Sequence, residues 1–490
     1  MINIYRKLFT FIFLLVSFSV LNAQVFDGVW NCLYATIDDQ PNATGNRTIS
    51  VATSGDNAFA ALVADFADSC YYIVNYKDAD SLNGRLGSYQ YSGKGQVTMW
   101  LAGFDQVSLT RAKDMAHFKI GDHDLLFVAS NDPEKNILVF KMTPDSIETY
   151  PMRMSTASNP FDIKNIWAID MDNSGRVYVT TEGTESIPSE VWVYESPSKE
   201  TAWSDGYMAT PIQTITLPDN GDARGVAVNG DGTVVYVSNY LTKKVYCYTG
   251  DPATGYTLYN GFSFLISDEV TDGTTTIYPG PWGLTYMRDY NILFVSSATD
   301  YENNAIGYSY GKIFIVNPNN GEIMDTLDAA EWNFEKTGAY NNNGPGNVSG
   351  YASPYNCDVD DLNNLYAVSY YGWTIDKWQY LGTLPIITLT ITSIEIEDGT
   401  IPNSFSLEQN YPNPFNPNTT IKFSLVERSN ISLDIYSISG ELVSSLIEAA
   451  EFEKGVYEVT FNASNLASGT YIYTITDGSR TLSKKLTLIK

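Results

Sequence analysis

The chain has 490 residues, which is enough for two or three domains with a sizeable core. Its 56 acidic and 29 basic residues give a formal net charge of −27, so its surface repels phosphate backbones and anionic bilayers, and we expect no nucleic-acid partner. Aromatic residues make up 13% of the chain and charged residues only 17%. Together with turns rich in Asn, Asp and Gly, this composition predicts an all-β protein.

The N-terminus has the order of a secretory signal peptide. Arg6 and Lys7 precede an apolar run from Leu8 to Leu21, and Asn22-Ala23 then offers a small residue for cleavage. The run is too short for a comfortable membrane span, and no later stretch approaches the roughly 18 apolar residues that a span requires. We expect an exported, soluble mature protein that begins near Gln24.

The chain has four cysteines, which allow three full pairings in an oxidising compartment: Cys32, Cys70, Cys247 and Cys357. A bridge from Cys32 to Cys70 is the first candidate, on nearness in sequence alone. Cys247 and Cys357 lie in strand-like segments, where buried unpaired thiols are the alternative to a bridge.

One pattern repeats between about residue 110 and residue 380: two short apolar strands around a polar turn, then a third strand that ends in an aromatic residue. Equivalent valines are 51, 58, 58 and 73 residues apart, near or somewhat above the period of propeller blades. The copies begin at Met115, Trp167, Arg224, Trp282 and Tyr355. Residues 46–78 supply one more, so a β-propeller of about six blades is predicted.

The turns within these copies are DNSG, NGDG and DLNN, which favour tight connections between antiparallel strands. NGDG lacks the carboxylate series and the final Glu of an EF-hand loop. We therefore predict no cofactor, with calcium as the alternative. The copies AIDMDNSGRVYVTTEG and GVAVNGDGTVVYVSN resemble blades of the NHL and YVTN class of β-propellers. That class includes binding proteins, lactonases and lyases, so the resemblance implies a fold and leaves the activity open.

Candidate catalytic residues are few. His117 and His123 belong to no HExxH motif or Cys/His cluster, and no GxSxG elbow, P-loop or dinucleotide fingerprint occurs in its required setting. His117 is expected to be a packed, hydrogen-bonded residue. Asp170 and Asp358 fall at inner-strand positions and are expected to face a central channel, where a cation site is the alternative to a solvated channel.

One aligned position is more informative for binding. Four copies carry a large side chain directly before the small or Asn residue that opens the strand: Trp167, Arg224, Trp282 and Tyr355. Equivalent positions in blades lie on one ring, so these residues are predicted to surround one mouth of the channel, partly exposed, and to bind a ligand. The alternative is that they pack between blades as ordinary core.

The composition changes near Gly399. The alternating segment from Ile387 to Ile396 predicts one last strand, and the prolines Pro412, Pro414 and Pro417 predict a domain boundary. Five strand-like segments at short spacing then predict a small antiparallel sandwich.

Residues 404–490 resemble the type A C-terminal sorting domain of the type IX secretion system of Bacteroidetes-like bacteria. The matching segments are NYPNPFNP from Asn410, Ile435-Tyr436 with Gly440, Leu466 with the segment SGTY from Ser468, and Lys484-Lys485 before the closing Leu488-Ile489-Lys490. The resemblance implies an address read by the secretion machinery at the outer membrane and usually removed on export. An ordinary structural Ig-like module is the alternative.

The predicted organisation is a signal peptide (1–23), a β-propeller (24–398), a linker (399–403) and an Ig-like sorting sandwich (404–490). We expect an extracellular or surface-attached module that binds a glycan or protein ligand. The alternative is a propeller hydrolase or lyase that acts on a lactone or polysaccharide with channel carboxylates and calcium.

Overall fold

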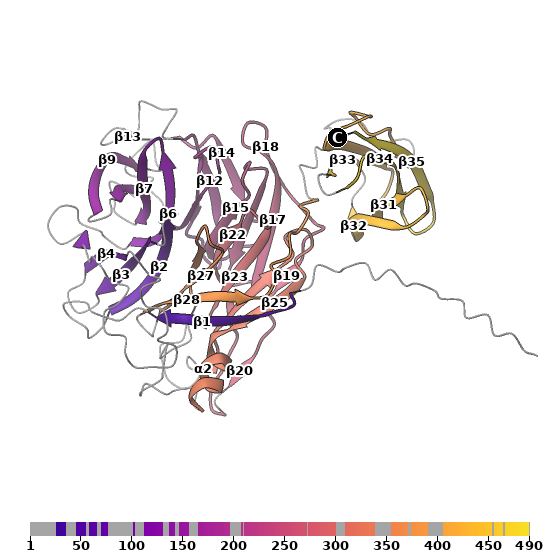
Figure 1. Ribbon diagram of the computed structural model, residues 1–490. Coiled ribbons are helices and arrows are strands. Elements are labelled where there is room, and N and C mark those ends of the chain that lie inside the picture. The colour runs from indigo at the N-terminus through magenta and orange to yellow at the C-terminus, as the bar shows by residue number, and fades with distance from the viewer. Residues whose placement is uncertain are drawn as a thin grey trace, which may run out of the picture.

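A computed structural model shows a large body of β-sheets followed by a small β-sandwich (Figure 1). The structure describes residues 26–35, 46–54, 58–65, 70–76, 101–102, 112–130, 137–142, 147–155, 165–196, 207–208, 210–271, 273–299, 309–338, 354–370, 374–390, 405–452, 455–463 and 466–489. The predicted signal peptide lies outside these residues. No helix within them is long and apolar enough to cross a membrane.

The first three sheets of the large body follow one another along the chain. The first contains β2 (Asn46–Ser54), β3 (Ala58–Asp65), β4 (Cys70–Tyr76) and β5 (Leu101–Ala102). The second contains β6 (Ala112–Ile120), β7 (His123–Ser130), β8 (Ile137–Met142), β9 (Ile147–Ser155) and the short parallel β13 (Tyr207–Met208). The third contains β10 (Ile166–Met171), β11 (Val177–Thr181), β12 (Glu190–Tyr194) and β14 (Gln213–Thr216).

The next three sheets complete the large body. The fourth contains β15 (Ala223–Val228), β16 (Val234–Asn239), β17 (Lys244–Asp251), β18 (Gly255–Leu258) and β19 (Phe264–Leu265). A hairpin of β20 (Val270–Thr271) and β21 (Thr276–Ile277) precedes the fifth, which contains β22 (Gly280–Met287), β23 (Ile292–Ala298), β24 (Lys312–Val316) and β25 (Ile323–Asp328). The sixth contains β26 (Cys357–Val359), β27 (Leu365–Ser369), β28 (Thr374–Leu381) and β1 (Val29–Ala35).

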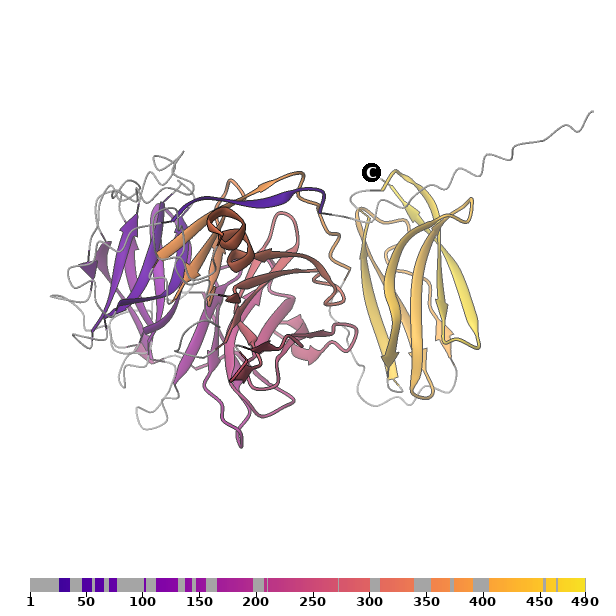
Figure 2. The same ribbon diagram turned by 90° about the horizontal axis from the view of Figure 1, so that it is seen from below.

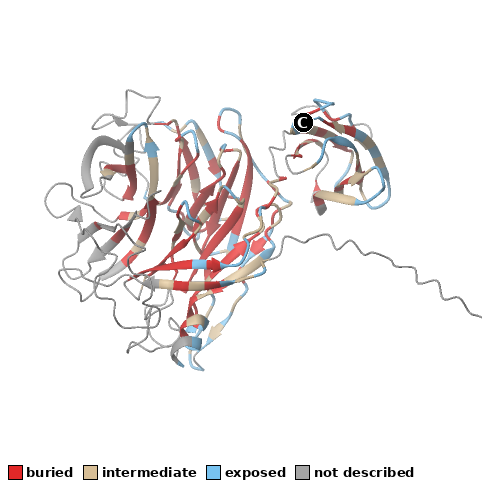
Figure 3. Ribbon diagram, viewed as in Figure 1, coloured by how far each residue is buried: buried red, intermediate tan, exposed pale blue. Residues whose placement is uncertain are grey.

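These sheets form a β-propeller. The first strand of each sheet contacts the first strand of the next, in the order β2, β6, β10, β15, β22 and β26, and β26 contacts β2 again. The second strands, such as β16 and β23, are buried along their whole length because neighbouring sheets cover both faces, as Figure 3 shows in red. The all-β prediction is confirmed. Six sheets are counted in the described residues, and the blade number of the whole domain stays a prediction.

The N-terminal strand closes the propeller. β1 pairs with β28 as the outermost strand of the sixth sheet, so the first and last strands of the propeller lie side by side (Figure 1). The junction is reinforced by the Gly28 N–H, which donates to the Tyr380 hydroxyl at 2.5 Å, and by the Thr383 N–H, which donates to Asp27 Oδ1 at 3.0 Å. The end strands therefore hold each other in place.

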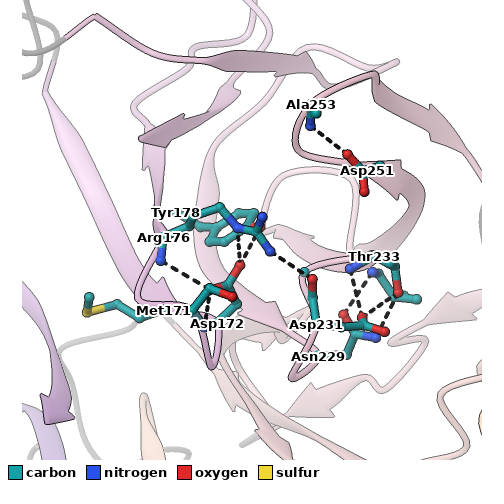
Figure 4. A network of polar contacts seen from close by, with 12 residues as sticks. Met171, Asp172, Arg176, Tyr178, Asn229, Asp231, Thr233, Asp251 and Ala253 are labelled. Carbon is teal, nitrogen blue, oxygen red and sulfur yellow. Dashed lines mark hydrogen bonds and ion pairs between the residues drawn. The ribbon is translucent and has the colours of Figure 1, made fainter. Parts of the chain in front are cut away.

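The predicted tight turns are confirmed, and their carboxylates serve the turns themselves. Asp172 Oδ1 accepts the N–H groups of Ser174 at 2.8 Å and Arg176 at 3.1 Å, and Gly175 takes a φ of 78° that favours glycine (Figure 4). Asp360 repeats this arrangement in the sixth sheet. These two carboxylates are thus used by their own loops.

The strand predicted from Ile387 to Ile396 is not formed in its described part, residues 387–390, and residues 391–396 lie outside the described residues. Residues 383–390 join no sheet. Their polar groups bond instead to turns of the fifth sheet: the Ile387 N–H donates to Tyr290 O at 2.8 Å, and the Thr390 N–H donates to Asn319 Oδ1 at 2.7 Å. Alternation of apolar residues in the sequence does not reveal that this segment packs against turns, where Ile387 and Thr390, three positions apart, are its buried residues.

The remaining elements of the propeller are local. α2 (Ala329–Thr337) follows β25, begins at an Asp328 cap that accepts the N–H groups of Ala330 and Glu331, and ends at Gly338. Cys247 and Cys357 are buried free thiols, as the alternative to a bridge expected. The predicted Cys32–Cys70 bridge is wrong, because Cys32 is buried and forms no disulfide.

The C-terminal residues form two facing sheets. One contains β29 (Ser406–Leu407), β30 (Asn418–Leu425) and β33 (Gly455–Asn462), and the other contains β31 (Ser429–Ser437), β32 (Leu442–Phe452), β34 (Gly469–Thr476) and β35 (Thr481–Leu488). Figure 2 shows them in yellow beside the propeller. Their side chains share one core, and the Ig-like classification stays a prediction.

The proline-rich stretch belongs to this sandwich. Phe415 is buried, its N–H donates to Thr487 O, and its carbonyl accepts the Ile489 N–H. Asn410 is also buried, and its Nδ2 donates to Thr419 Oγ1 at 2.8 Å. The stretch therefore holds the last strand β35 in place, and any boundary lies before it.

Candidate functional site

The four predicted ring residues meet at one end of the channel. Trp167, Arg224 and Trp282 lie near the first residues of β10, β15 and β22, and Tyr355 precedes β26. The rings of Trp167 and Trp282 meet edge to face at 6.0 Å between centroids, and Trp282 stacks on Tyr355 at 4.7 Å. The Arg224 guanidinium carbon lies 3.5 Å from the ring centre of Trp167 and 4.3 Å from that of Trp282.

Further residues that the sequence analysis missed complete this group. Lys113 of β6 places Nζ 4.0 Å from the Trp167 ring centre, and Lys243 places Nζ 3.9 Å from that of Tyr240. Tyr240 meets Trp282, and Tyr370 stacks on Tyr355 at 4.5 Å. We call all eight residues the aromatic–cation cluster: Lys113, Trp167, Arg224, Tyr240, Lys243, Trp282, Tyr355 and Tyr370.

The cluster packs on itself rather than forming an open ring. Trp167, Arg224 and Trp282 are partly exposed as predicted, but Tyr355 is buried at 5% exposure because Trp282 and Tyr370 cover its two faces. Arg224 also pairs with Asp222. Trp167 Nε1 and Arg224 Nε are buried with no acceptor among the described residues.

A central cavity of about 470 Å³ is lined by residues of the first, second, third, fifth and sixth sheets. It runs from the layer next to the cluster, which contains Asp114 and Asn356, to exposed Lys119 and Asp361 at its open end. The prediction that Asp170 and Asp358 face the channel is confirmed. None of the four predicted ring residues lines the cavity, so the two features are separate.

Three of the carboxylates that line the cavity join neighbouring sheets. Asp170 Oδ2 accepts the Val228 N–H at 2.8 Å, and Asp358 Oδ2 accepts the N–H and hydroxyl of Thr53 at 2.7 and 2.9 Å. Asp114 accepts the Ile169 N–H at 3.1 Å. In all three cases the donor lies on the next sheet around the propeller, so these residues fix the spacing of the innermost strands.

Asp114 is the most enclosed of the three carboxylates. Besides Ile169, it accepts the Ser50 hydroxyl at 2.7 Å and the Asn356 amide at 2.8 Å, so four sheets meet at one carboxylate. Burial raises the pKa of Asp114 to about 7, although these hydrogen bonds oppose the shift. The neighbouring Asp170 charge adds to it.

Two ion pairs stand nearer the open end. Arg288 reaches from the fifth sheet to the third, where it pairs with Asp170 Oδ1 at 3.3 Å and donates to Met171 O. Burial nevertheless raises the pKa of Asp170 to about 6. His117 contacts Asp124 at 3.2 Å, and this hydrogen bond lowers the pKa of Asp124. The prediction of a hydrogen-bonded His117 is confirmed, while the His123 side chain lies outside the described residues.

Two chemistries are available to this cavity. Its carboxylates and Arg288 offer acceptors and donors for a polar ligand, and two carboxyl groups with raised pKa values offer acid–base chemistry. Within the described part of the chain, no three His, Cys, Asp or Glu residues are placed to hold a metal ion.

Comparison with known families identifies the C-terminal part. Residues 409–490 match the model of the secretion system C-terminal sorting domain. This domain implies interaction with the type IX secretion machinery and export to the cell surface or the extracellular space. A comparison with curated protein sequences gave no match.

Solved structures similar to this chain are β-propellers of varied roles. They include a luciferin-regenerating enzyme (11% identity, 75% of this chain, 100% of that chain, TM-score 0.41). A second is regucalcin, a calcium-binding protein of Agrobacterium tumefaciens (11% identity, 73% of this chain, 98% of that chain, TM-score 0.38). A third is the Cps50 (Swd1) β-propeller domain of Myceliophteria thermophila (11% identity, 68% of this chain, 83% of that chain, TM-score 0.36). These likenesses concern the fold and leave the role of this propeller open.

Proposed function

We propose that this protein is an extracellular binding module, in which the sorting domain directs export and the propeller holds its ligand in the central cavity. The observation that carries the proposal is the cavity itself, whose volume of about 470 Å³ lies within the roughly 300–1,000 Å³ typical of ligand pockets. Its size suits a small polar molecule or the end of a glycan or protein chain.

The walls of the cavity support a preformed site. Asp114, Asp170 and Asp358 are each held by a backbone N–H of the neighbouring sheet, so their positions are set before any ligand arrives. A carboxylate has about four acceptor sites, and the hydrogen bonds of Asp170 and Asp358 leave part of this capacity for a ligand. Arg288 supplies donors beside them.

The domain boundaries are part of this proposal. A mature cargo from about Gln24 to about residue 400 keeps both β1, which closes the sixth sheet, and the segment 383–390, which bonds to the fifth. The predicted sorting domain at 404–490 then carries all the strands of the sandwich. Intact mass of the secreted protein tests this, and a form free in the medium that retains residues 404–490 contradicts it.

A second candidate function is catalysis on a lactone or polysaccharide, and a specific observation favours it. Asp114 and Asp170 have pKa values raised to about 7 and about 6 in one cavity, close to the pH at which general acids and bases work best. We place binding first because both carboxylates are already engaged with neighbouring strands.

Asp358→Asn and Asp170→Asn in the secreted protein separate these candidates. On a glycan array, loss of a wild-type signal in both variants, with retention in the exposed-loop control Asp251→Asn, supports a cavity ligand. If the wild type forms a product from any glycan of the array and Asp170→Asn does not, the result supports catalysis instead. Binding that survives both cavity variants contradicts the cavity as the ligand site.

A further inference from the structure

The other end of the channel has a different chemistry, which the proposed function does not use. We propose that the aromatic–cation cluster is a second binding site, which takes the carboxylate group of an acidic sugar in an extracellular polysaccharide. This inference is independent of any ligand in the central cavity. It rests on the charges of the cluster, on two unused donors and on the partly exposed rings.

The charge of the cluster contrasts with the rest of the chain. The protein has a net charge of −27 with only 29 basic residues, yet three cationic side chains lie on rings of this cluster: Lys113, Arg224 and Lys243. A cation on an aromatic face keeps its formal charge. Arg224 is already paired with Asp222, but the three cations of the cluster outnumber that one carboxylate, which favours a further carboxylate as the ligand.

Two donors in the cluster lack acceptors. Trp167 Nε1 and Arg224 Nε find no hydrogen-bond partner among the described residues, although the guanidinium carbon lies 3.5 Å from the Trp167 ring centre. Burying a donor without an acceptor is unfavourable. The carboxylate of Asp222, which pairs with another nitrogen of Arg224, leaves both of these donors unused, so they indicate a place for a further acceptor. A carboxylate has two oxygens and bonds to guanidinium groups with particular strength.

The aromatic part of the cluster selects a sugar over a bare anion. Trp167, Trp282 and Tyr370 are partly exposed and stand beside the cations. The rim of such rings offers apolar contact to the C–H groups of a sugar while the carboxylate engages the donors. Arg224 already occupies faces of both tryptophans, so the ligand contacts the ring edges and does not enter between the rings.

The adjacent residues Lys243 and Lys244 provide a matched pair. Lys243 lies over Tyr240 inside the cluster, whereas Lys244 is exposed and pairs with Asp219 outside it. Lys243→Gln and Lys244→Gln remove the same charge from adjacent positions. Trp167→Phe is a second probe, because it keeps an aromatic ring and removes only the unpartnered N–H together with part of the ring area.

The experiment measures binding of the secreted protein to oligogalacturonate and to alginate oligosaccharide by titration calorimetry. Carboxyl-reduced oligogalacturonate and poly-glutamate serve as neutral and peptide counterparts. We expect saturable binding to at least one polyuronate, weakened about tenfold by Lys243→Gln, Arg224→Gln or Trp167→Phe and unchanged by Lys244→Gln. Binding should also weaken as salt rises from 50 to 300 mM. Melting curves confirm that each variant folds.

Four outcomes overturn the proposal: no binding to either polyuronate, equal binding of the carboxyl-reduced oligomer, tighter binding of poly-glutamate, or folded cluster variants that bind like the wild type. Loss of polyuronate binding in Asp358→Asn with retention in Lys243→Gln would move the ligand to the central cavity and also reject the cluster. Failure of every cavity ligand leaves this test unaffected.

Discussion

The two ends of the propeller channel are built from the same strands and differ in chemistry because they use different positions of those strands. Near their first residues, β10, β15 and β22 place Trp167, Arg224 and Trp282, which pack on one another. Three residues further along, β10 places Asp170, which bonds to the next strand and faces the cavity. One end of the channel is thus closed by side-chain packing. At the other end the carboxylates bond to backbone N–H groups of the next strand and leave the channel open.

This difference shows how one repeat supports two kinds of site. Large side chains from sheets that are not neighbours meet and fill the channel, as Trp167 of the third sheet and Trp282 of the fifth do. A short carboxylate reaches only the neighbouring strand and leaves the axis free, as Asp358 does with Thr53. Side-chain length at each position therefore decides whether a layer of the channel is filled or hollow.

The largest predicted effect is at the closed end. Trp282→Ala removes the ring that contacts Trp167, Tyr240, Tyr355 and Arg224, and we expect a loss of about 3–5 kcal/mol in the free energy of unfolding. Denaturant unfolding measures it, with Trp192→Phe in β12 as a control for a conservative change. A loss below about 1 kcal/mol would mean that the cluster is a loose surface, as an open ring requires.

The second prediction concerns Asp114, which lies between the two ends, and the pH dependence of stability that its ionisation causes. The pKa of Asp114 is about 7 in the folded protein and 3.8 in the reference state, so the folded state keeps a proton that the unfolded chain loses. Stability from this group is present below pH 4 and is lost as pH rises to 7, by an amount of the order of 4 kcal/mol. Asp170 and Asp358, whose pKa values are also raised, act in the same direction.

Asp114→Asn isolates this contribution, because an amide cannot ionise. Unfolding of the wild type and of Asp114→Asn should be compared between pH 4 and pH 8. We expect the unfolding free energy of the variant to fall less between pH 4 and pH 8 than that of the wild type. At pH 8 the variant should therefore be the more stable of the two, each relative to its own value at pH 4. Parallel curves for the two proteins would show that Asp114 is ionised throughout and that its burial is compensated.

Comparison of sequence and structure explains why only part of this contrast is predictable. Trp167, Trp282 and Tyr355 are found from the sequence because each directly precedes a small or Asn residue in an aligned copy. Lys113 is missed because the aligned copy begins two residues later at Met115, although Lys113 lies at a register shift of β6 like those that contain Arg224 and Trp282 in β15 and β22. Pattern alone cannot place an irregularity of this kind.

Distances across the axis are not encoded in the period of the repeat. The spacing places Arg224 and Trp282 on one ring, but whether the ring is open or self-packed depends on the radius that six sheets leave. The same limit hides the role of Asp114, which joins residues 64 and 242 positions away, Ser50 and Asn356. The strand predicted to begin at Ile387 is not found over residues 387–390 for a related reason, since the hydrogen-bond partners of this segment are turns of another sheet.

The third prediction concerns the hydrogen bonds between carboxylates and backbone N–H groups at the open end. Asp170→Ala leaves the Val228 N–H without its acceptor and Arg288 without its carboxylate, and we expect a loss of about 2 kcal/mol in unfolding free energy. Asp170→Asn retains an acceptor oxygen and should recover about half of it. Equal losses in both variants would assign the effect to the Arg288 pair rather than to the hydrogen bond from the Val228 N–H.

The smallest predicted effect tests whether β6 contributes to the closed end. Lys113→Met keeps most of the side-chain volume over Trp167 and removes the ammonium group, so only the cation–π contribution, about 0.5–1 kcal/mol, should be lost. Trp167→Leu removes the aromatic partner, and the double variant completes a cycle whose coupling energy should fall in the same range. A coupling energy near zero would place Lys113 outside the cluster. Four sheets rather than five would then contribute side chains to the closed end. A coupling within the expected range would instead make the ammonium group of Lys113 a fixed part of the cation array, because a side chain that is coupled to Trp167 cannot move away from it without losing that energy.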